Sequence, residues 1–582
     1  MAAPKSPVSI ILLIIIISTK LTISLAQSQS NCWKSDRDAL MAFKNAISTD
    51  TTASLSTWTN ASDPCSGGWV GVVCHPLSGR VTQLTLQNPT PTAAYMEGSL
   101  SPSLADLSYL ETLLITGMKR ITGTIPQAFF RLSRLTTLVL DDNALSGPLP
   151  PTLPTKLNAL SLSGNRFTAR IPSLSLFTNL STLSLSRNLF IGQIPPLPPT
   201  LQFLDLSFNS LSGPITILGV NRLTNLVLTG NRLSGPIPES IFRLPHLSEL
   251  SIDHNQLTGN IPPKISALTT LAVLRLSNNK LTGRIPASLS QLNNLWDLNL
   301  SRNSLIGPLP VEFDKGLPSL SSLDLSFNKF SLKSVPNWIK DRKTLTDVRL
   351  ASCGLQGPLP VFANPDILTT VDLSSNGFTG TEISNFLQRM PYLNSANLSH
   401  NLLRADVSTI RLPAQISVLD LSSNGLSGSL SRLLTTETRK FVQVLDLSRN
   451  DISGIIPEFR SGLGLEVLNL AGNKISGPIP DSISRVTGLE RLDISRNRVM
   501  GQIPMGLGKL HNLQWLDLSN NGLSGPIPAS WAANATLKHL SLRNNRLSGS
   551  IPQFRPFNVF PKAAYSGNKG LCGKPLPLCK AH

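Results

Sequence analysis

The stretch LDLSNNGLSGPIP, residues 516–528, determines how most of this chain folds, because close copies of it recur along the sequence. Variants begin at Leu204 (LDLSFNSLSGPI), Leu298 (LNLSRNSLIGPLP) and Leu468 (LNLAGNKISGPIP). A string that occurs so often cannot mark one active site. It is the unit of an internal repeat, and units of about 20–50 residues build arrays in which each unit contacts its neighbours.

The repeat follows the pattern L-x-x-L-x-L-x-x-N, whose Asn returns every 21–26 residues from Asn143 to Asn545. Cys353 is the one residue of that series that is not Asn, and we expect it to be buried rather than a reactive thiol. Two degenerate copies, beginning at Val81 and Leu110, precede the series. The sequence therefore predicts about 20 repeats over residues 81–560.

The alternating L-x-L of each repeat predicts a short strand with its leucines pointing inward and the intervening residues outward. Stacked strands form one parallel sheet on the inner, concave face, spaced by about 4.8 Å per repeat. The Asn turns the chain out of the strand, and its amide offers donors and an acceptor to the buried backbone of adjacent turns. One repeat cannot bury its leucine face alone, whereas a stack can. The predicted fold class is therefore an α/β solenoid.

Both ends of such a stack need a cap that covers the exposed core. Residues 27–80 are expected to form the N-terminal cap, because Leu40, Phe43 and Ile47 have helical spacing within it. Residues 561–582 are expected to form the C-terminal cap.

The cysteines concentrate in these two caps and suggest disulfides. Cys65 and Cys74 are close enough in sequence to staple the N-terminal cap. A pair between Cys32 and Cys65 is the alternative, and the sequence leaves the choice open. Cys572 and Cys579 are expected to pair and to close the final turn.

Residues 1–26 have the features of a secretory signal peptide. Lys5 supplies the charge, an apolar run follows, and the segment ends at Ala26. Lys20 interrupts the apolar run well before the roughly 20 residues that a membrane span needs, and no later segment resembles a span. The mature chain is therefore expected to be secreted and soluble.

Secretion would make the Asn-X-Ser/Thr sequons candidate glycosylation sites. They are Asn60, Asn179, Asn299, Asn397 and Asn534. Asn299 and Asn397 fall inside predicted strands, so the other three are the stronger candidates.

The net charge of +18 has two interpretations. One is retention on acidic pectin, and the other is diffuse surface charge that keeps the protein soluble. The secretory route and the lack of dense Lys/Arg runs argue against nucleic acid as a partner.

Three parts of the chain together resemble the extracellular plant leucine-rich-repeat proteins. They are the cap that begins DRDALMAFK at Asp36, the repeats of type LxxLxLSxNxLSGxIP, and the tail SGNKGLCGKPLPLC that begins at Ser566. Within that group the chain looks most like receptor-like proteins, polygalacturonase-inhibiting proteins and the DNA-damage-repair/toleration-type repeat proteins. The resemblance implies a right-handed superhelix whose concave face binds peptides, proteins or wall fragments, often beside a receptor kinase.

The chain also departs from two of these subgroups. Polygalacturonase inhibitors have about half as many repeats and a paired-Cys cap, and receptor-like proteins usually continue into a membrane span.

No catalytic residue, metal ligand or cofactor site is predicted. The sequence has no HExxH, no GxGxxG after a strand, no kinase catalytic loop and no Cys/His metal spacing. The Asp of LDLS forms a column of carboxylates, which could be compared with the carboxylate pair of a glycoside hydrolase. Because it is the consensus residue of the repeat, we interpret it as a solvated strand position and do not expect an enzyme.

Residues that break the consensus on the outward strand face are the candidates for ligand binding, because aromatic and Arg side chains are favoured in binding hot spots. They gather in the eighth to twelfth repeats. The candidates are Glu249, Asp253, His254, Arg275, Trp296, Asp297, Asp347 and Arg349. Trp296 has an alternative interpretation, in which it packs against the next repeat.

The predicted function is recognition by a secreted, non-catalytic glycoprotein of the plant apoplast or cell wall. It would bind a peptide, a protein or a wall polysaccharide in defence or developmental signalling. One alternative is an inhibitor of microbial polygalacturonase-type wall hydrolases. The other is a receptor-like protein that acts at the plasma membrane with a receptor kinase. The expected partners are therefore an extracellular peptide or protein ligand, a receptor kinase ectodomain or a microbial hydrolase, and acidic pectin.

Overall fold

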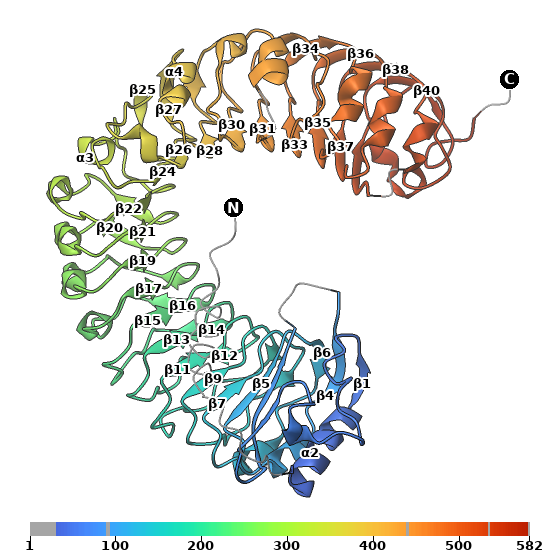
Figure 1. Ribbon diagram of the computed structural model, residues 1–582. Coiled ribbons are helices and arrows are strands. Elements are labelled where there is room, and N and C mark those ends of the chain that lie inside the picture. The colour runs from blue at the N-terminus through green and yellow to red at the C-terminus, as the bar shows by residue number, and fades with distance from the viewer. Residues whose placement is uncertain (1–30, 89–92, 438–440, 534–535, 580–582) are drawn as a thin grey trace. The chain divides into compact units, whose positions relative to one another are not determined.

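The computed structural model describes residues 31–88, 93–437, 441–533 and 536–579. The expected signal peptide, residues 1–26, and the sequon at Asn534 lie outside the described residues. The chain divides into two compact units, Met1–Leu201 and Gln202–His582 (Figure 1). Each unit is built from the predicted repeats.

The first unit begins with the N-terminal cap. Its helix α2 (Lys34–Asn45) turns Leu40 and Phe43 inward, as their helical spacing predicts. Phe43 packs on Trp58 with ring centroids 6.2 Å apart, and Trp58 stacks on Trp69 at 5.2 Å. These three buried rings form a small core of their own beneath the helix.

A buried ion pair joins this cap to β3 (Val81–Gln87), the first parallel strand of the stack. Asp36 is fully buried, and its carboxylate accepts the backbone N–H of Val81 at 2.9 Å. The same carboxylate pairs with Arg80, Nη2 to Oδ1 at 2.8 Å. Loss of either partner would leave a buried charge uncompensated, so the contact fixes how the cap sits on the strand.

The main sheet of the first unit continues from β3 in parallel, with its leucines in register. Its further strands are β5 (Thr112–Thr116), β7 (Thr137–Val139), β9 (Ala159–Ser161) and β11 (Thr182–Ser184), and β2 (Val72–Cys74) pairs antiparallel with β3. The flanking strands are β1 (Ile47–Asp50), β4 (Met96–Ser99), β6 (Lys119–Thr122), β8 (Ser146–Gly147), β10 (Arg166–Phe167) and β12 (Ile191–Gly192).

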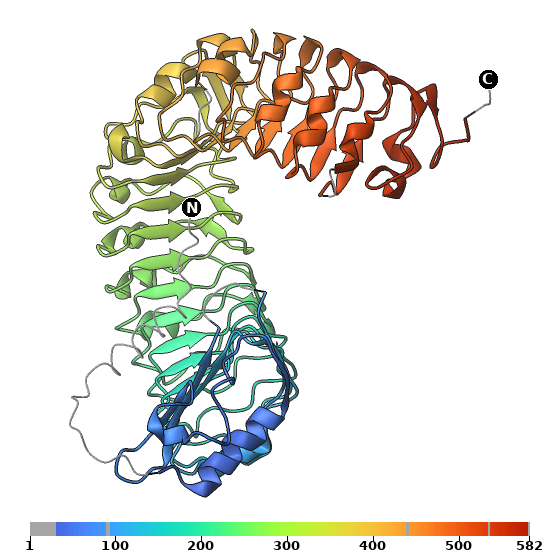
Figure 2. The ribbon, with the colours of Figure 1, turned by 45° about the vertical axis from the view of Figure 1, so that its right-hand side comes forward.

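The second unit contains a longer parallel sheet of three-residue strands, which lines the inner side of its curved stack (Figures 1 and 2). The strands are β13 (Phe203–Asp205), β15 (Asn225–Val227), β17 (Glu249–Ser251), β19 (Val273–Arg275), β21 (Asp297–Asn299), β23 (Ser322–Asp324), β24 (Asp347–Arg349), β26 (Thr370–Asp372), β28 (Ser395–Asn397), β30 (Val418–Asp420), β31 (Val444–Asp446), β33 (Val467–Asn469), β35 (Arg491–Asp493), β37 (Trp515–Asp517) and β39 (His539–Ser541). Each pairs in register with the next, so a buried leucine, valine or alanine of every strand joins one continuous core. The predicted solenoid with a parallel sheet is confirmed.

A second set of strands flanks the long sheet in the second unit. They are β14 (Ser210–Gly213), β16 (Arg232–Gly235), β18 (Gln256–Leu257), β20 (Thr282–Arg284), β22 (Ser304–Ile306), β25 (Gln356–Pro358), β27 (Gly377–Gly380), β29 (Leu402–Leu403), β32 (Ser453–Ile455), β34 (Lys474–Gly477), β36 (Arg498–Gln502), β38 (Gly522–Gly525), β40 (Arg546–Ser550) and β41 (Gly570–Cys572). They use the LSG part of the repeat, where glycines such as Gly525 (φ 76°) adopt a backbone that other residues rarely take.

Short 3-10 helices occupy the IP half of many repeats. They include Pro102–Asp106, Gln127–Arg131, Ile241–Arg243, Pro263–Ala267, Ala287–Gln291, Val311–Asp314, Pro365–Ile367, Val407–Thr409, Asp481–Arg485, Met505–Lys509 and Ala529–Ala533. Between residues 330 and 441, where the sequence loses the regular SGxIP, they give way in part to α3 (Asn337–Lys340), α4 (Ile383–Gln388) and the π-helix Leu433–Glu437.

The Asn of each repeat forms the expected ladder. In one example the side-chain Nδ2 of Asn521 donates to the carbonyls of Leu518 (3.2 Å) and, one repeat back, Ile494 (3.0 Å). Its Oδ1 accepts the backbone N–H of Val499 at 3.0 Å. Cys353 takes the same place, is 1% exposed and directs Sγ to the carbonyl of Leu325 at 3.4 Å. Burial raises the pKa of this thiol to about 12, so it is protonated and unreactive.

The C-terminal cap packs on the last repeats through buried aromatic rings. Trp531 stacks on Phe557 at 5.9 Å, and the hydroxyl of the buried Tyr565 donates to the Phe557 carbonyl at 2.9 Å. A disulfide joins Cys572 to Cys579 beyond them.

Candidate binding surface

Two rows of outward-facing residues run along the long sheet of the second unit. Parallel strands in register align equivalent side chains, so the residue before the central core residue of each strand forms one row and the residue after it forms the other. We call these the first row and the second row. On β35, β37 and β39 the first row reads Arg491, Trp515 and His539, and the second row reads Asp493, Asp517 and Ser541.

The binding residues predicted from sequence lie on β17 to β24 and beside them. Glu249, Asp297 and Asp347 stand in the first row, whereas Arg275 and Arg349 stand in the second. From β17 to β24 there are four strand spacings, about 19 Å. The structure thus places these residues along one face, as an extended patch.

Three further predicted residues lie just outside the strands. Trp296 precedes β21 with 46% of its surface exposed, so about half of the residue is covered by its surroundings. Asp253 and His254 follow β17 and bind each other, with His254 Nδ1 and Asp253 Oδ2 at 2.9 Å. We call all eight predicted residues the central patch.

Both arginines of the central patch are bound to carboxylates of the same patch. Arg275 donates to Asp297 Oδ2 through Nε (2.9 Å) and Nη2 (2.6 Å). Arg349 Nη2 contacts Asp347 Oδ2 at 2.8 Å. An incoming anion would have to displace these internal partners. The patch therefore presents less free positive charge than its sequence indicates.

Asp347 has a raised pKa within this patch. Burial is the main cause that raises its pKa to about 6, and the nearby Asp324, Asp297 and Asp372 add to the rise. The ion pair with Arg349 acts in the opposite direction. Burial prevails because only one carboxylate oxygen is paired, while Oδ1 is buried with no hydrogen-bond partner among the described residues.

A second concave region, which the sequence did not single out, lies on β31 to β39. Here a hollow of about 470 Å³ is lined by Arg449, Arg491, Arg496 and Arg543, with Asp493 and Asp517 between them. We call it the arginine hollow.

A local change in the repeat creates this hollow. The turns after β31 and β35 carry Ser448-Arg449 and Ser495-Arg496, whereas the turn between them carries Ala471-Gly472. Gly472 sits at φ 69°, close to the 53° of Arg449, so the backbone path is the same and only the side chain is missing. The missing arginine leaves space between its two neighbours.

A three-membered stack stands beside the hollow and contributes Arg491 to its lining. The guanidinium carbon of Arg491 lies 4.6 Å from the ring centroid of Trp515. On the next strand His539 stacks on Trp515 at 3.6 Å with an interplanar angle of 11°. Burial lowers the pKa of His539, so the neutral imidazole extends the stack without repelling Arg491. The stack holds Arg491 in place before any ligand arrives.

The four arginines of the hollow differ from those of the central patch in their partners. None of them forms an ion pair with a carboxylate of the described residues, and all four side chains are exposed. Asp493 and Asp517 accept backbone N–H groups of their own turns at 3.0 and 2.8 Å. Burial raises the pKa of Asp493. The hollow consequently offers unpaired positive charge.

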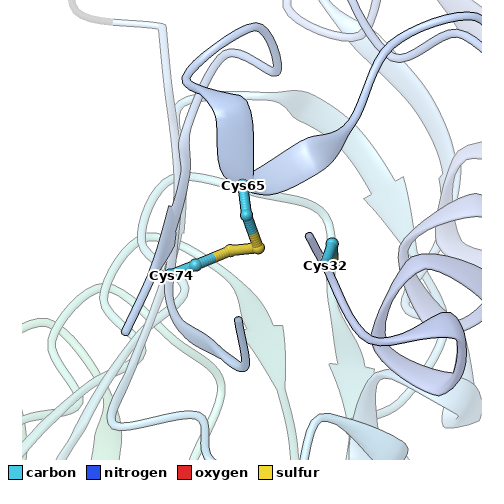
Figure 3. A group of neighbouring side chains, drawn as sticks. All are labelled: Cys32, Cys65 and Cys74. Carbon is cyan, nitrogen blue, oxygen red and sulfur yellow. A yellow bond between two sulfur atoms is a disulfide. The ribbon is translucent and has the colours of Figure 1, made fainter. Parts of the chain in front are cut away.

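The N-terminal cap contains a cluster of three sulfur atoms within 4.8 Å of one another (Figure 3). Cys65 and Cys74 form a disulfide, which settles the pairing that the sequence left open. Cys32 keeps a free thiol beside it. Burial, with Asp36 and Asp63 nearby, raises the pKa of that thiol to about 12. Because two of the sulfurs are bonded to each other, the cluster in this state has one thiol to offer rather than a thiolate set for a metal.

The sequons of the described residues fall into two groups. Asn60 and Asn179 are exposed on surface turns of the first unit. Asn299 and Asn397 stand in the second row on β21 and β28, where their Oδ1 atoms accept the backbone N–H groups of Ser301 and Ser399.

Comparisons with known families agree with the repeat. Residues 34–75 match the leucine rich repeat N-terminal domain, and residues 222–244, 245–305, 440–499 and 487–547 match leucine rich repeat families. The chain thus carries a leucine-rich-repeat N-terminal domain followed by leucine-rich repeats. It is 34% identical over 148 residues to the DNA damage-repair/toleration protein DRT100 of Arabidopsis thaliana, and 32% identical over 159 residues to receptor-like protein EIX1 of Solanum lycopersicum. These alignments cover 24% and 25% of the chain, and 38% and 15% of the two relatives.

Solved plant ectodomains share the architecture over a larger part of this repeat protein. The Arabidopsis receptor kinase HAESA, solved with the peptide hormone IDA and the co-receptor SERK1, has a TM-score of 0.61 and 29% identity over 94% of the chain and 100% of its own. PEPR1 in its structure with AtPEP1 has a TM-score of 0.60 and 28% identity, and covers 93% of the chain and 83% of its own. In the described part of the chain, no helix is both long and apolar enough to span a membrane.

Proposed function

We propose that this leucine-rich-repeat protein is an extracellular, non-catalytic recognition protein that binds a peptide or protein ligand on the concave sheet of its second unit. The arginine hollow carries the proposal, because none of its four arginines forms an ion pair with a carboxylate of the described residues. Arg491 is already held by stacking on Trp515, so it loses little freedom when a ligand is bound.

The solved relatives support a ligand in this class. HAESA was solved with the peptide hormone IDA and the co-receptor SERK1, and the plant peptide hormone receptor RGFR1 was solved with RGF2. A partner kinase is therefore included in the proposal as the route by which binding would be signalled. The proposal also includes action in defence or developmental signalling, and the similarity to receptor-like proteins such as EIX1 is its support.

The test is capture of ligands from plant extracellular fluid on the immobilised secreted protein, followed by mass spectrometry of what elutes. We expect peptides or proteins that bind the wild type but are lost with Arg491→Ala. Arg275→Ala is the control, since that arginine is already held by Asp297. Equal capture by all three proteins, or capture lost only with Arg275→Ala, would contradict the assignment of the site.

A further inference from the structure

The first row next to the arginine hollow is apolar over three successive strands. Val418, Val444 and Val467 face outward in register on β30, β31 and β33, and the following strand places Arg491 in the same row. All three valines are half-buried. One straight row thus passes from apolar side chains to a fixed cation.

The spacing of this row determines how many ligand residues can lie along it. Neighbouring strands are about 4.8 Å apart, so Val418 and Arg491 are separated by about 14 Å. An extended peptide rises about 3.3 Å per residue, so about four residues cover that distance. A chain lying across the strands would place apolar side chains on the valines and its next group in the hollow.

Resting on the proposed function, we infer the chemistry of the ligand: an extended peptide with an apolar segment of about four residues followed by a single carboxylate. The apolar segment lies along Val418, Val444 and Val467, and the carboxylate enters the arginine hollow. The hollow is complementary to that carboxylate because Arg491 is already oriented by Trp515.

A uniformly acidic polysaccharide fits this surface less well. Its charges would be placed on the valine row, where they would lose water and gain no partner. In addition, Asp420 and Asp446 stand in the second row beside those valines and would repel a second negative group. An apolar chain with one anionic position avoids both costs.

The sequence offers a variant that closes the hollow with little disturbance of the fold. Gly472→Arg restores the residue that Arg449 and Arg496 provide in the flanking repeats. A Cβ on Gly472 would meet nothing closer than Arg449 Cγ at 3.4 Å, an ordinary contact. The matched control is Asn278→Arg, which adds an arginine at the equivalent left-handed position (φ 51°) beside the central patch.

The experiment selects peptides from a displayed library of random linear 12-residue sequences on the secreted wild-type protein. We expect enriched sequences that carry an Asp or Glu after an apolar run of about four residues. Synthetic versions should lose about 10- to 100-fold in affinity on Gly472→Arg and on Arg491→Ala. Arg491→Ala removes charge-assisted hydrogen bonds, whereas the Gly472→Arg side chain fills the space that the carboxylate enters. Asn278→Arg should bind as the wild type does. Equal thermal midpoints for the four proteins establish that each is folded.

Three results would overturn the inference: no enrichment, enriched peptides without an acidic residue, or binding that survives Gly472→Arg. Fragments of polygalacturonate provide a separate arm. If they bind tighter than the selected peptides and depend on Arg491, the hollow recognises an acidic polysaccharide and the peptide chemistry is wrong. If natural ligands from extracellular fluid still require Arg491 while the selected peptides lack the pattern, the proposed function stands and only the ligand chemistry fails.

Discussion

The central patch and the arginine hollow lie on the same sheet and are built from the same repeat, yet they use their arginines differently. In the central patch, Arg275 and Arg349 are neutralised by Asp297 and Asp347. In the hollow, the guanidinium of Arg491 stacks on the ring of Trp515 and forms no ion pair with a carboxylate of the described residues. A charge that breaks the consensus is available to a ligand only when the neighbouring repeat does not already supply its counterpart.

Leucine-to-alanine changes in the core should destabilise both regions by similar amounts, and this loss of stability is the largest effect we predict. Leu298 under the central patch and Leu492 under the hollow are both fully buried in strands of the same sheet. Each change to Ala should lower the free energy of unfolding by about 2–5 kcal/mol, from lost burial and the cavity left behind. Urea denaturation followed by circular dichroism measures both. A loss below about 1 kcal/mol at either site would show that its strand is not packed as described.

Substitution of Trp515 and of Trp296 should affect stability and peptide binding differently in the two regions. Trp515 stacks on His539 and on the guanidinium of Arg491. Trp515→Ala should therefore lower the free energy of unfolding by about 1–2.5 kcal/mol and weaken binding of an acidic peptide. Trp296 has no ring or cation contact with another described residue, so Trp296→Ala should change stability by about 0.5 kcal/mol or less. Thermal denaturation and peptide titration of both variants test the contrast, which a larger loss at Trp296 would reverse.

The periodicity was sufficient to predict the scaffold. Leucine spacing gave the strands, the recurring Asn gave the ladder, and the departure at Cys353 was understood as a buried member of it. These features are repeated, so each copy supports the others. The N-terminal disulfide needed the structure, because Cys32, Cys65 and Cys74 all lie close enough for two pairings.

The sequence did not predict the arginine hollow, and the reason is physical. It depends on a side chain that is missing at Gly472, and a search for unusual large residues does not detect a missing one. Two signals could have located it: the turn AGN between two SRN turns, and the run of Arg491, Trp515 and His539 at one register position. The internal ion pair of the central patch could also have been predicted from the sequence, since Arg275 and Asp297 are one repeat apart with opposite charges.

The pH dependence of stability should come in part from the central patch. The pKa of Asp347 is raised to about 6 from 3.8, so the folded state binds its proton more tightly than the unfolded state. Ionised Asp347 therefore destabilises the fold above about pH 6, and stability from this group rises as the pH falls from 6 towards 4.

Asp347→Asn removes this titration. We expect its thermal midpoint to exceed that of the wild type at pH 7.5 and the difference to shrink at pH 4.5. Using the difference between the two proteins cancels the titration of other groups. A variant that is less stable at pH 7.5 would mean that the ion pair with Arg349 outweighs burial.

A small effect is also expected for the coupling between Arg275 and Asp297, which measures how firmly the central patch holds its own charge. Both side chains meet through two hydrogen bonds, but 40% of the arginine side chain is exposed, so water screens the pair. A double-mutant cycle with Arg275→Ala and Asp297→Ala should give a coupling of about 0.2–1 kcal/mol. An acidic peptide selected on the hollow should gain little affinity for the central patch when Asp297→Ala frees Arg275, because a single unstacked arginine lacks the preformed cavity. If that variant does acquire strong binding, unpaired charge alone makes a site on this sheet, and the shape created at Gly472 is not needed.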